Sequence, residues 1–519
     1  MSARFDAIVI GSGHNGLTCA GYLAKSGLKV LVLERRGIVG GACTTEELVP
    51  GAPGFRFNVC ATDHVFIHLN PVIEDLRLRS FGLDYIDIDP MFFIPYPDGR
   101  CLFLYRDLEK TVKEIEKLSP RDAKSYRRFA EDWLRVGEAL MPAFFAPPVP
   151  FEDLAQLLDG KTEGSFAADL TANVKQLVDE GFETDYLRGP LAWFGSQTGA
   201  SPSDPGTGLI SGLFMTIHRI GVKRPKGGSG MLPLALARSV EHYGGIIRTD
   251  AEVKRILIRR GEAYGVELEG GEQILANCIV SNADPKRTFL KLVEAQHLEE
   301  GFLRKVEGIK VTAYKLKIDA AIKELPDYAS FPGRTVQPNH RASQLICPSA
   351  EYLEDAYHDA KLHERLSANP AMWVATQSAA DPSLAPPGAH TLYLWAAYFS
   401  VEKPRNGSLE KVKEEASNRA LATLSAYAPN VEEAILARET KSHVDLEQML
   451  ALPKGNSMHV DPTLDQLWTL RPLPGWSNYR TPIENLYLTG SGTHPFGGIN
   501  AIPGYNTAHV VLRDRGILP

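Results

Sequence analysis

The sequence lacks several features that would indicate particular classes of protein. No stretch approaches the roughly 20 consecutive apolar residues that a membrane-spanning helix requires. The six cysteines are scattered, and none of them forms a Cys-x-x-Cys pair. This spacing argues against a secreted disulfide framework, a zinc ribbon and a redox-active dithiol. His218 and His459 have no companions at metal-ligand spacing, so we expect no metal site.

An excess of positive charge is also missing. The formal net charge is −7, which gives no reason to expect binding to nucleic acid. The first predicted strand begins near residue 6, so we expect no signal or transit peptide ahead of it and a cytoplasmic, reducing location. With 519 residues, the chain is too long for one ordinary core, and we expect two or more domains.

The clearest pattern present is an apolar run followed by a glycine turn near the N-terminus. Ala7–Ile10 predicts a parallel strand that is buried on both faces. The turn has the form G-x-G-x-x-G. Gly11 allows the tight turn, Gly13 lets a pyrophosphate approach the backbone, and Gly16 lets the next helix pack on the strand. Free N–H groups at the start of that helix attract the phosphates.

A second strand and an acidic residue complete this pattern. Val30–Leu33 predicts the strand, and Glu34 follows Gly16 by eighteen residues. A carboxylate at this position is placed to accept both hydroxyls of an adenosine ribose, and it would repel a 2′-phosphate. Because strand, turn, helix, second strand and acid agree, the segment from Asp6 to Arg36 predicts a dinucleotide site that suits NAD or FAD.

The residues after Glu34 favour the more extended cofactor, FAD. Gly40 and Gly41 allow the backbone to approach such a cofactor closely. Arg36 lies over the ribose or reaches a phosphate, and a solvated arginine at a strand end is the equal alternative. A glycine-rich turn with Gly228 and Gly230 opens a later helix and is a second candidate contact with the cofactor or an anion.

The C-terminal region supports FAD as well. Asn485–Gly490 predicts a buried strand that meets a glycine turn, and Tyr505–Leu512 predicts a helix. A strand, turn and helix beside the first strand would bring backbone amides onto the ribityl chain and ring of a flavin. The start of this helix, near Ile502, would stabilise negative charge on a reduced flavin.

The remaining chain predicts a second, substrate-binding part. Residues 107–140 and 409–427 have helical periodicity, and 311–318 and 390–399 are strand-like. Residues 246–282 predict a strand meander that forms a small sheet across the flavin fold. The predicted FAD-binding domain comprises residues 1–60, 222–290 and 481–519, and the predicted substrate-binding domain comprises residues 61–221 and 291–480.

Two apolar segments interrupt this second part. Met141–Phe151 is aromatic, uncharged and rich in prolines, which forbid a regular helix. It is either a buried loop under the substrate domain or an exposed lip that dips into a membrane. Residues 191–221 are rich in glycine between aromatic anchors and predict a packed wall, with plain core as the alternative.

These motifs resemble those of a flavoprotein superfamily that contains phytoene desaturases, carotenoid isomerases and bacterial β-carotene ketolases. The likeness extends over nearly the whole chain and is greatest to the ketolase type. It is carried by the segments IGSGHNGLTCAGYLAKSGLKVLVLERR, GGACTTEE, FRFNVCATDH, RPKGGSG and LRPLPGWSNYRTPIENLYLTGSGTHPFGG. The resemblance implies an α/β, two-domain FAD-binding Rossmann-like fold of the glutathione-reductase or amine-oxidase type, with an inserted mixed α+β substrate domain.

The resemblance also implies roles for individual residues. Contacts with FAD are implied for Gly11, Gly13, Gly16, Glu34, Arg36, Gly40, Gly41, Val253, Gly490, Gly492 and Ile502. The chain departs from the family pattern at Phe496, Asn500 and Tyr505. We expect these three residues to face the flavin or the substrate.

The implied activity is that of an FAD-dependent oxidoreductase. It would act as a desaturase, ketolase or isomerase on a long apolar carotenoid or other isoprenoid, with peripheral membrane contact as one option. The alternatives are a soluble FAD oxidase of a small substrate such as an amine, and a non-catalytic flavin-binding partner protein.

No acid–base pair stands out in the sequence. His494 is the first candidate for a catalytic or orienting group, and a histidine that bonds a turn carbonyl is the equal alternative. His64 is the second candidate, although we favour a core or capping role for it. His14 lies inside the glycine turn, where contact with phosphate or solvent is the favoured role.

Overall fold

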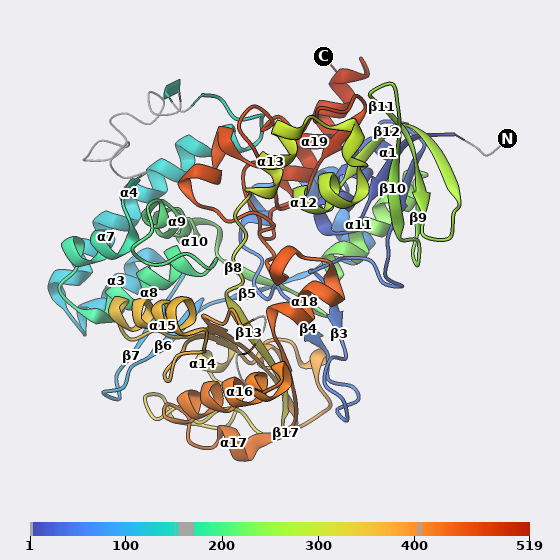
Figure 1. Cartoon of the computed structure of the whole chain (residues 1–519). Coiled ribbons are helices and arrows are strands. Elements are labelled where there is room, and N and C mark those ends of the chain that lie inside the picture. Colours follow the sequence, from blue (N-terminus) through green and yellow to red (C-terminus); the bar gives the residue numbers. More distant parts are fainter. Residues whose placement is uncertain (1–3, 151, 154–170, 402–403, 405–406, 519) are drawn as a thin grey trace.

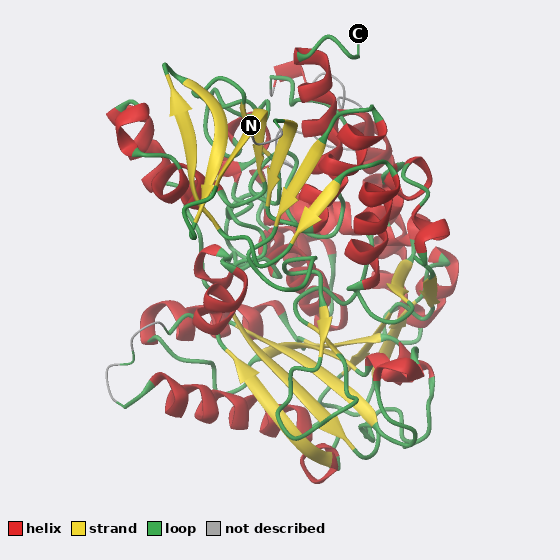
Figure 2. Ribbon diagram, turned by 90° about the vertical axis from the view of Figure 1, so that its right-hand side faces the viewer, coloured by secondary structure: helices red, strands yellow, loops and turns green. Residues whose placement is uncertain are grey.

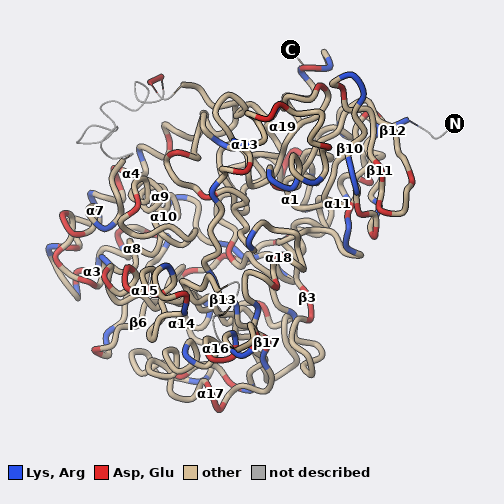
Figure 3. The backbone as a smooth tube through the Cα atoms, in the orientation of Figure 1, with Lys and Arg blue, Asp and Glu red and all other residues tan. Residues whose placement is uncertain are grey.

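The chain forms two β-sheets that are surrounded by helices, as the computed structural model shows (Figures 1 and 2). The structure describes every residue except 1–3, 151, 154–170, 402–403, 405–406 and 519. Figure 3 shows lysines and arginines interspersed with acidic residues over both parts of the molecule. No helix in the described part of the chain is long and apolar enough to cross a bilayer.

The first sheet contains the predicted dinucleotide strands and has the order β10-β11-β12-β1-β2-β9, with β18 paired to β12. Neighbours among β9, β2, β1, β12 and β18 pair in parallel, whereas β10, β11 and β12 form an antiparallel extension. Its strands are β1 (Phe5–Ile10), β2 (Val30–Leu33), β9 (Ile246–Arg248), β10 (Val253–Arg259), β11 (Glu262–Leu268), β12 (Gln273–Ser281) and β18 (Leu486–Leu488).

The strand meander extends this sheet and does not form a separate one. β12 is long enough to pair twice, with β11 along residues 273–275 and with β1 along residues 276–281. The prediction of four strands over residues 246–282 is therefore confirmed, but the separate crossing sheet is wrong.

Helices cover both faces of the first sheet, which explains the continuous apolar runs of its central strands. On one face, α1 (His14–Lys25) packs beside α11 (Met231–His242) and α19 (Ile502–Asp514). On the other face, Phe302 of α13 (Glu300–Glu307) packs against the strands. Strands β1 and β2 and helix α1 begin and end within two residues of their predicted positions.

Two segments pack with the first sheet although we assigned them to the substrate domain. Ile67, Val72 and Leu76 belong to the same buried cluster as α1. Phe302 and Val306 belong to the cluster on the opposite face. The division into two domains stays a prediction, and these packing contacts bear on where its boundaries would lie.

The second sheet has the order β17-β13-β16-β15-β14-β6-β7 and is antiparallel except where β6 meets β14. Helix α16 (Leu409–Ser425) packs on one face and confirms the predicted helix. The strands are β6 (Phe92–Pro95), β7 (Cys101–Leu104), β13 (Lys315–Ile322), β14 (Ser343–Ile346), β15 (Ala371–Ala375), β16 (His390–Ala397) and β17 (Ile435–Lys441).

Strand β13 begins four residues later than we predicted. The N–H group of Thr312 donates to the Asp461 carboxylate at 2.9 Å, so it does not pair with a neighbouring strand. A side chain that is distant in sequence therefore decides where this strand starts.

A layer of helices covers the other face of the second sheet and carries the glycine-rich segment 191–221. Helices α8, α9 and α4 pack together in one buried cluster with Phe92 and partly buried Trp373 of the sheet. These helices are α3 (Leu108–Glu116), α4 (Pro120–Phe144), α7 (Val174–Gly181), α8 (Asp185–Ser196), α9 (Thr207–Phe214), α10 (Ile217–Ile220) and α15 (Ala350–His363).

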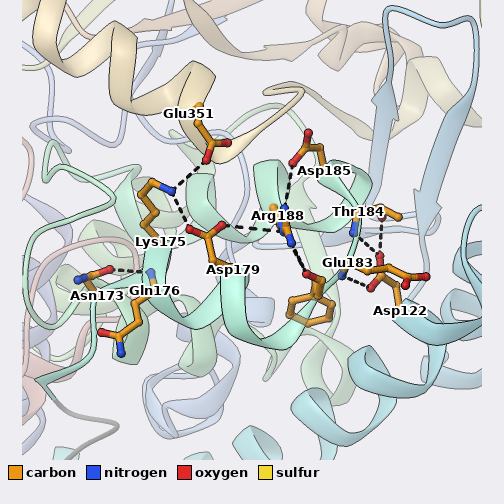
Figure 4. A network of polar contacts seen from close by, with 11 residues as sticks. Asp122, Asn173, Lys175, Gln176, Asp179, Glu183, Thr184, Asp185, Arg188 and Glu351 are labelled. Carbon is orange, nitrogen blue, oxygen red and sulfur yellow. Dashed lines mark hydrogen bonds and ion pairs between the residues drawn. The ribbon is translucent and has the colours of Figure 1, made fainter.

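A polar network fixes the start of α8 (Figure 4). The fully buried Asp122 carboxylate accepts hydrogen bonds from the N–H groups of Glu183 and Thr184, at 2.7 and 3.0 Å. Lys175 of α7 bonds Asp179 at 2.7 Å and Glu351 of α15 at 2.9 Å. These contacts tie α4, α7, α8 and α15 together.

The segment Met141–Phe151 differs from both interpretations that we considered. Helix α4 continues through Pro142 to Phe144, because a proline in the last turn removes only one intrahelical hydrogen bond. Phe144 is buried, whereas Val149 is 38% exposed and its carbonyl accepts a bond from Trp468 Nε1 at 2.6 Å. Phe151 lies outside the described residues.

Candidate functional site

One continuous cavity of about 420 Å³ connects the glycine turn after β1 with the second sheet. At one end it is lined by the backbone and polar side chains of the dinucleotide fingerprint, which we call the cofactor end. At the other end it is lined by aromatic and aliphatic side chains, which we call the apolar wall. The residues of the cofactor end that line the cavity include Gly11, Gly13, His14, Asn15, Glu34, Arg36, Gly40, Gly41 and Val253.

The glycines of the turn have separable physical roles. Gly11 has a φ of +91°, a conformation that disfavours any side chain. Gly13 forms a backbone bridge with Gly40, so the two glycine segments lie side by side at the cavity. A Cβ atom on Gly16 would lie 2.3 Å from the carbonyl oxygen of Gly11, so Gly16 is needed for the packing of α1. Gly16 does not itself line the cavity.

The Glu34 side chain lies in the cofactor end, as we predicted. Its carboxylate accepts bonds from Ser12 N–H at 3.0 Å, from Ser12 Oγ at 2.7 Å and from Arg36 N–H at 2.9 Å. The residue is only 5% exposed and lines the cavity. Its contact with a ribose stays a prediction, for which this orientation is suitable.

Arg36 is neither a solvated arginine nor directed wholly at the cavity. Its Nη2 atom pairs with Glu46 at 2.7 Å, and the side chain is 17% exposed. The residue also lines the cavity. Arg36 therefore remains available at the rim of the cofactor end, with its position set by Glu46.

Asn282 is a residue of the cofactor end that we did not predict. It follows β12 as Glu34 follows β2, and its side chain lies beside Gly11, Gly13 and Gly490. Its position at the carboxyl end of a parallel strand was the available signal, because ligands of open α/β sheets bind at that edge.

The C-terminal segment reaches the cavity through different residues from those we predicted. Ser491 and residues 495–499 line the cavity, whereas Gly490 and Gly492 do not. Gly490 has a φ of +90° and faces Asn282, and a Cβ on Gly492 would lie 2.7 Å from Pro285. These two glycines allow neighbouring segments of the protein to pack closely.

Of the three positions that depart from the family pattern, Phe496 alone lines the cavity. Its ring packs edge-on against Phe144. Asn500 is fully buried, and its Oδ1 atom accepts from the Ile502 N–H group at 2.8 Å, so it caps α19. Tyr505 packs against Tyr22 of α1. The expectation that Asn500, Ile502 and Tyr505 face the ligand therefore lacks support from the geometry, because α19 directs them into protein contacts.

The turn at residues 224–231 also serves the protein itself. A Cβ on Gly228 would lie 2.4 Å from Thr45 Oγ1, and a Cβ on Gly230 would lie 2.9 Å from the Thr45 nitrogen. Neither glycine is among the residues that line the cavity. The close approach that we predicted at these glycines is real, but it is made by Thr45 and not by a ligand.

Unsatisfied polar atoms show that the cofactor end suits a polar ligand. Among the described residues, four buried atoms of the cavity lining have no hydrogen-bond partner, namely His14 Nε2, Asn15 Oδ1, Arg36 Nη1 and His459 Nδ1. Buried polar atoms are normally paired, and bound FAD would supply partners here. The glycine turn, Glu34 and these atoms therefore fit FAD.

The apolar wall includes residues from both predicted apolar segments. Helices α4, α8 and α9 each contribute to it, and the second sheet closes it opposite them. The wall comprises Phe92, Leu140, Phe144, Trp193, Leu209, Ile210, Leu213, Phe214, Val222, Trp373, Trp395, Leu467 and Trp468. Met215 and Ile217 are fully buried behind it and do not line the cavity.

His494 lies behind the cavity rather than in it. It is fully buried, and its Nε2–H group donates to the Ala143 carbonyl at 3.3 Å. Burial is the main cause that lowers its pKa to about 3. This is the arrangement of a histidine that bonds a carbonyl, and a catalytic role for His494 stays an untested prediction.

The other histidines divide into structural and cavity-lining residues. His64 is fully buried and contacts the Tyr85 hydroxyl at 3.1 Å and Ser229 Oγ at 3.2 Å, which agrees with a core role. His14 and His459 line the cavity, and burial lowers their pKa values to about 4 and about 3. Both imidazoles are therefore neutral at physiological pH. The described residues contain no group of three or more His, Cys, Asp or Glu that could hold a metal ion.

A buried lysine stands directly behind the apolar wall. Lys315 is 1% exposed, its Nζ atom lies 3.6 Å from the centre of the Trp395 ring, and it donates to the Tyr314 hydroxyl at 2.9 Å. Tyr314 and Trp395 line the cavity. Cation–π contacts stabilise such a charge and fix both rings.

A family model described as an NAD(P)-binding Rossmann-like domain matches residues 9–76. This match covers the glycine turn, α1 and β2. Among solved structures, an oxidoreductase from Methanosarcina mazei has a TM-score of 0.62 at 18% identity, covering 98% of this chain and 100% of its own. The predicted α/β, two-domain fold class is thereby confirmed.

Three relatives align with nearly the whole chain. Pyridine nucleotide-disulfide oxidoreductase domain-containing protein 2 of Mus musculus is 33% identical over 99% of this chain and 94% of its own length. A limonene dehydrogenase polypeptide of Castellaniella defragrans is 29% identical over 99% and 95%. The neurosporene-forming phytoene desaturase of Cereibacter sphaeroides is 25% identical over 96% and 92%.

These relatives confirm the resemblance to the phytoene desaturase superfamily. They do not carry the narrower likeness to ketolases, because their names describe an oxidoreductase domain, a dehydrogenase and a desaturase. At 33% identity over almost its full length, the chain belongs to the family of pyridine nucleotide-disulfide oxidoreductase domain-containing protein 2 and is an FAD-dependent oxidoreductase.

Proposed function

We propose that this oxidoreductase removes hydrogen from a long apolar substrate of the isoprenoid class, such as a carotenoid. The observation that carries the proposal is the cavity that joins the cofactor end to the apolar wall. Apolar surface buried against such a wall contributes about 25 cal/mol per Å², so a long hydrocarbon gains affinity along its length. Two relatives are named for limonene and phytoene, which are both isoprenoid hydrocarbons.

Charge in the cavity argues against a small cationic amine as the substrate. Four carboxylates line it in the described part of the chain, and three of them, Glu34, Glu252 and Asp284, belong to the fingerprint and the strand ends near it. The fourth, Asp63, accepts from Arg224 Nε at 2.6 Å and is 6% exposed. An ammonium group in the apolar wall would lack a free carboxylate and would lose its hydration.

The protein contributes binding, orientation and exclusion of water. When bound, FAD accepts the hydride, because the redox chemistry belongs to the cofactor. The glycine turn and Glu34 hold its adenosine end, and Phe496 lies where the C-terminal segment meets the apolar wall. His459 lines the cavity with an unpartnered Nδ1 atom, and we assign it as the neutral group that is placed to receive the departing proton.

We also propose that the end of α4 and the segment after it contact a membrane, from which the substrate would enter. Residues 141–150 carry no charge, and Pro142, Ala146, Val149 and Pro150 are exposed. Exposed apolar patches mark interaction surfaces. Sedimentation with phosphatidylcholine vesicles tests this, because Val149→Asp would reduce the bound fraction whereas Val336→Asp, at another exposed valine, would not.

The activity is tested in hosts that accumulate phytoene or β-carotene, with pigments analysed by mass and absorption spectrum. New double bonds, measured as a loss of two mass units per step, support desaturation. A gain of oxygen indicates ketolation, and an unchanged mass with a shifted spectrum indicates isomerisation. Gly13→Val, which blocks the pyrophosphate approach, is the matched inactive control.

Purified protein gives an independent answer. Anaerobic addition of phytoene, β-carotene or limonene should bleach the flavin absorption in proportion to the product formed. Protein that holds FAD, keeps its colour with all three hydrocarbons and leaves the pigments unchanged would contradict the proposal. That result would favour a non-catalytic flavin-binding role, and bleaching by an amine alone would favour the amine oxidase alternative.

A further inference from the structure

A buried arginine holds the two loops of the cavity wall on which the C-terminal segment meets residues 458–468. Arg471 is 0% exposed, and its guanidinium donates to six backbone carbonyl oxygens. Four belong to one loop and two to the other. The acceptors and distances are Met458 (2.9 Å), Val460 (3.0 Å), Asp461 (3.5 Å), Gln466 (3.3 Å), Ser491 (2.6 Å) and Thr493 (3.1 Å).

The charge of Arg471 has no directly bonded counter-ion among the described residues. The Asp461 carboxylate is the acid that interacts with it electrostatically, but its oxygens are bonded to Thr312 and Asn456. Burial lowers the pKa of Arg471 to about 9, so the guanidinium remains charged at neutral pH. Buried charges are normally paired, and this one is solvated only by carbonyl dipoles.

This charge lies one layer of backbone behind the cavity. Met458, His459 and Ser491 line the cavity, and Arg471 bonds the carbonyls of the first and the last of them. His459 and His494 nearby are held neutral, partly by Arg471 itself. The positive charge in this part of the wall is therefore that of Arg471.

We propose that Arg471 is a positioning residue that fixes both loops against the cofactor and whose charge favours reduced FAD over oxidised FAD. Two-electron reduction adds negative charge to the flavin, and a fixed positive charge in a medium of low polarity stabilises it. A purely structural arginine would affect folding and total FAD affinity without changing the ratio of affinities for the two redox states.

The experiment is a measurement of the flavin midpoint potential at pH 7, by equilibration with reference dyes, together with the dissociation constant of FAD. Arg471→Met should weaken reduced FAD about tenfold more than oxidised FAD. A tenfold change in this ratio lowers the potential of a two-electron couple by about 30 mV. Arg471→Lys keeps the charge and loses most of the bonds, so it should retain the potential more closely. Arg480→Met, at a partly exposed ion pair with Asp514, is the control and should leave the potential unchanged.

A second variant keeps the test decisive if Arg471→Met fails to fold or to hold FAD. Asp461→Asn removes the nearest negative charge while keeping an oxygen acceptor for Thr312 and Asn456, so it should raise the potential. An unchanged potential in Asp461→Asn, or equal weakening of oxidised and reduced FAD in Arg471→Met, would overturn the proposal.

Discussion

The Glu34 carboxylate links three segments of the cofactor end. It accepts two bonds from Ser12 in the glycine turn and one from Arg36 beyond β2, and Ala251 donates to its backbone oxygen at 2.8 Å. The protein thus holds this carboxylate in place before a ligand binds. Such preorganisation lowers the entropy lost when a ribose is bound.

Glu34→Gln should weaken FAD binding about 10- to 100-fold, because hydrogen bonds to a charged acceptor are worth about 1.5–3 kcal/mol. The dissociation constant of FAD, measured by fluorescence quenching on the apoprotein, checks this. Glu272→Gln, at an exposed ion pair with Arg248, is the control. Equal affinities of the Glu34 and Glu272 variants would refute the ribose assignment.

Phe496 offers a test of the substrate end at the scale of one side chain. Its ring lines the cavity and contacts Phe66 and Phe144. Phe496→Ala should raise KM for an active isoprenoid substrate about tenfold, because a lost buried aromatic contact costs about 1.5–3 kcal/mol. The affinity for FAD should remain within about twofold, and Tyr505→Phe, which does not line the cavity, should leave KM unchanged. A larger effect of the Tyr505 variant than of the Phe496 variant would contradict this placement.

At the scale of elements, the position of α8 determines much of the apolar wall. This helix carries Trp193, which lines the cavity, and its start is held by the buried Asp122 carboxylate of α4 (Figure 4). Thr184 donates to the same carboxylate through its hydroxyl. A wall built from separate helices therefore depends on polar contacts at their ends.

Asp122→Ala should lower the free energy of unfolding by about 2–4 kcal/mol, because it leaves the buried N–H groups of Glu183 and Thr184 without an acceptor. Urea unfolding monitored by circular dichroism measures this change. Glu131→Ala, at an exposed site of the same helix, should change the free energy by less than about 0.5 kcal/mol. Equal effects of the two substitutions would show that the network does not fix the helices.

At the scale of the whole molecule, buried neutral histidines make stability depend on pH. Burial lowers the pKa values of His14 and His68 to about 4, and those of His459 and His494 to about 3, from 6.5. Between pH 6.5 and about 4, the unfolded chain therefore binds more protons than the folded chain. Stability is fully present above pH 6.5 and decreases as the pH falls.

By pH 5, each of these histidines should reduce the free energy of unfolding by up to about 2 kcal/mol relative to pH 7. Asp284 opposes the trend between pH 6 and 4, because burial raises its pKa to about 6. Urea unfolding of the apoprotein at pH 5, 6 and 7 tests the net effect. Unfolding midpoints that are equal or higher at pH 5 would contradict it.

Patterns that are local in sequence were predicted well. The strand, turn and helix from β1 to β2 depend on apolar runs and on glycine conformations, which neighbouring residues determine. The apolar segment 191–221 was also predicted as a wall, because its composition requires burial wherever it packs. The late start of β13 was not predicted, because the Asp461 side chain that prevents earlier pairing is remote in sequence.

The sequence by itself determined that the chain binds a dinucleotide at the end of β1, and that its middle part is apolar enough to enclose a hydrophobic ligand. Only the tertiary structure decided which residues of each segment face that ligand. Asn500 and Tyr505 resemble neighbouring cavity residues in sequence, but α19 directs them into contacts with Ile502 and α1. The physical reason is that the direction of a side chain depends on how its element packs, and partners hundreds of residues away determine that packing.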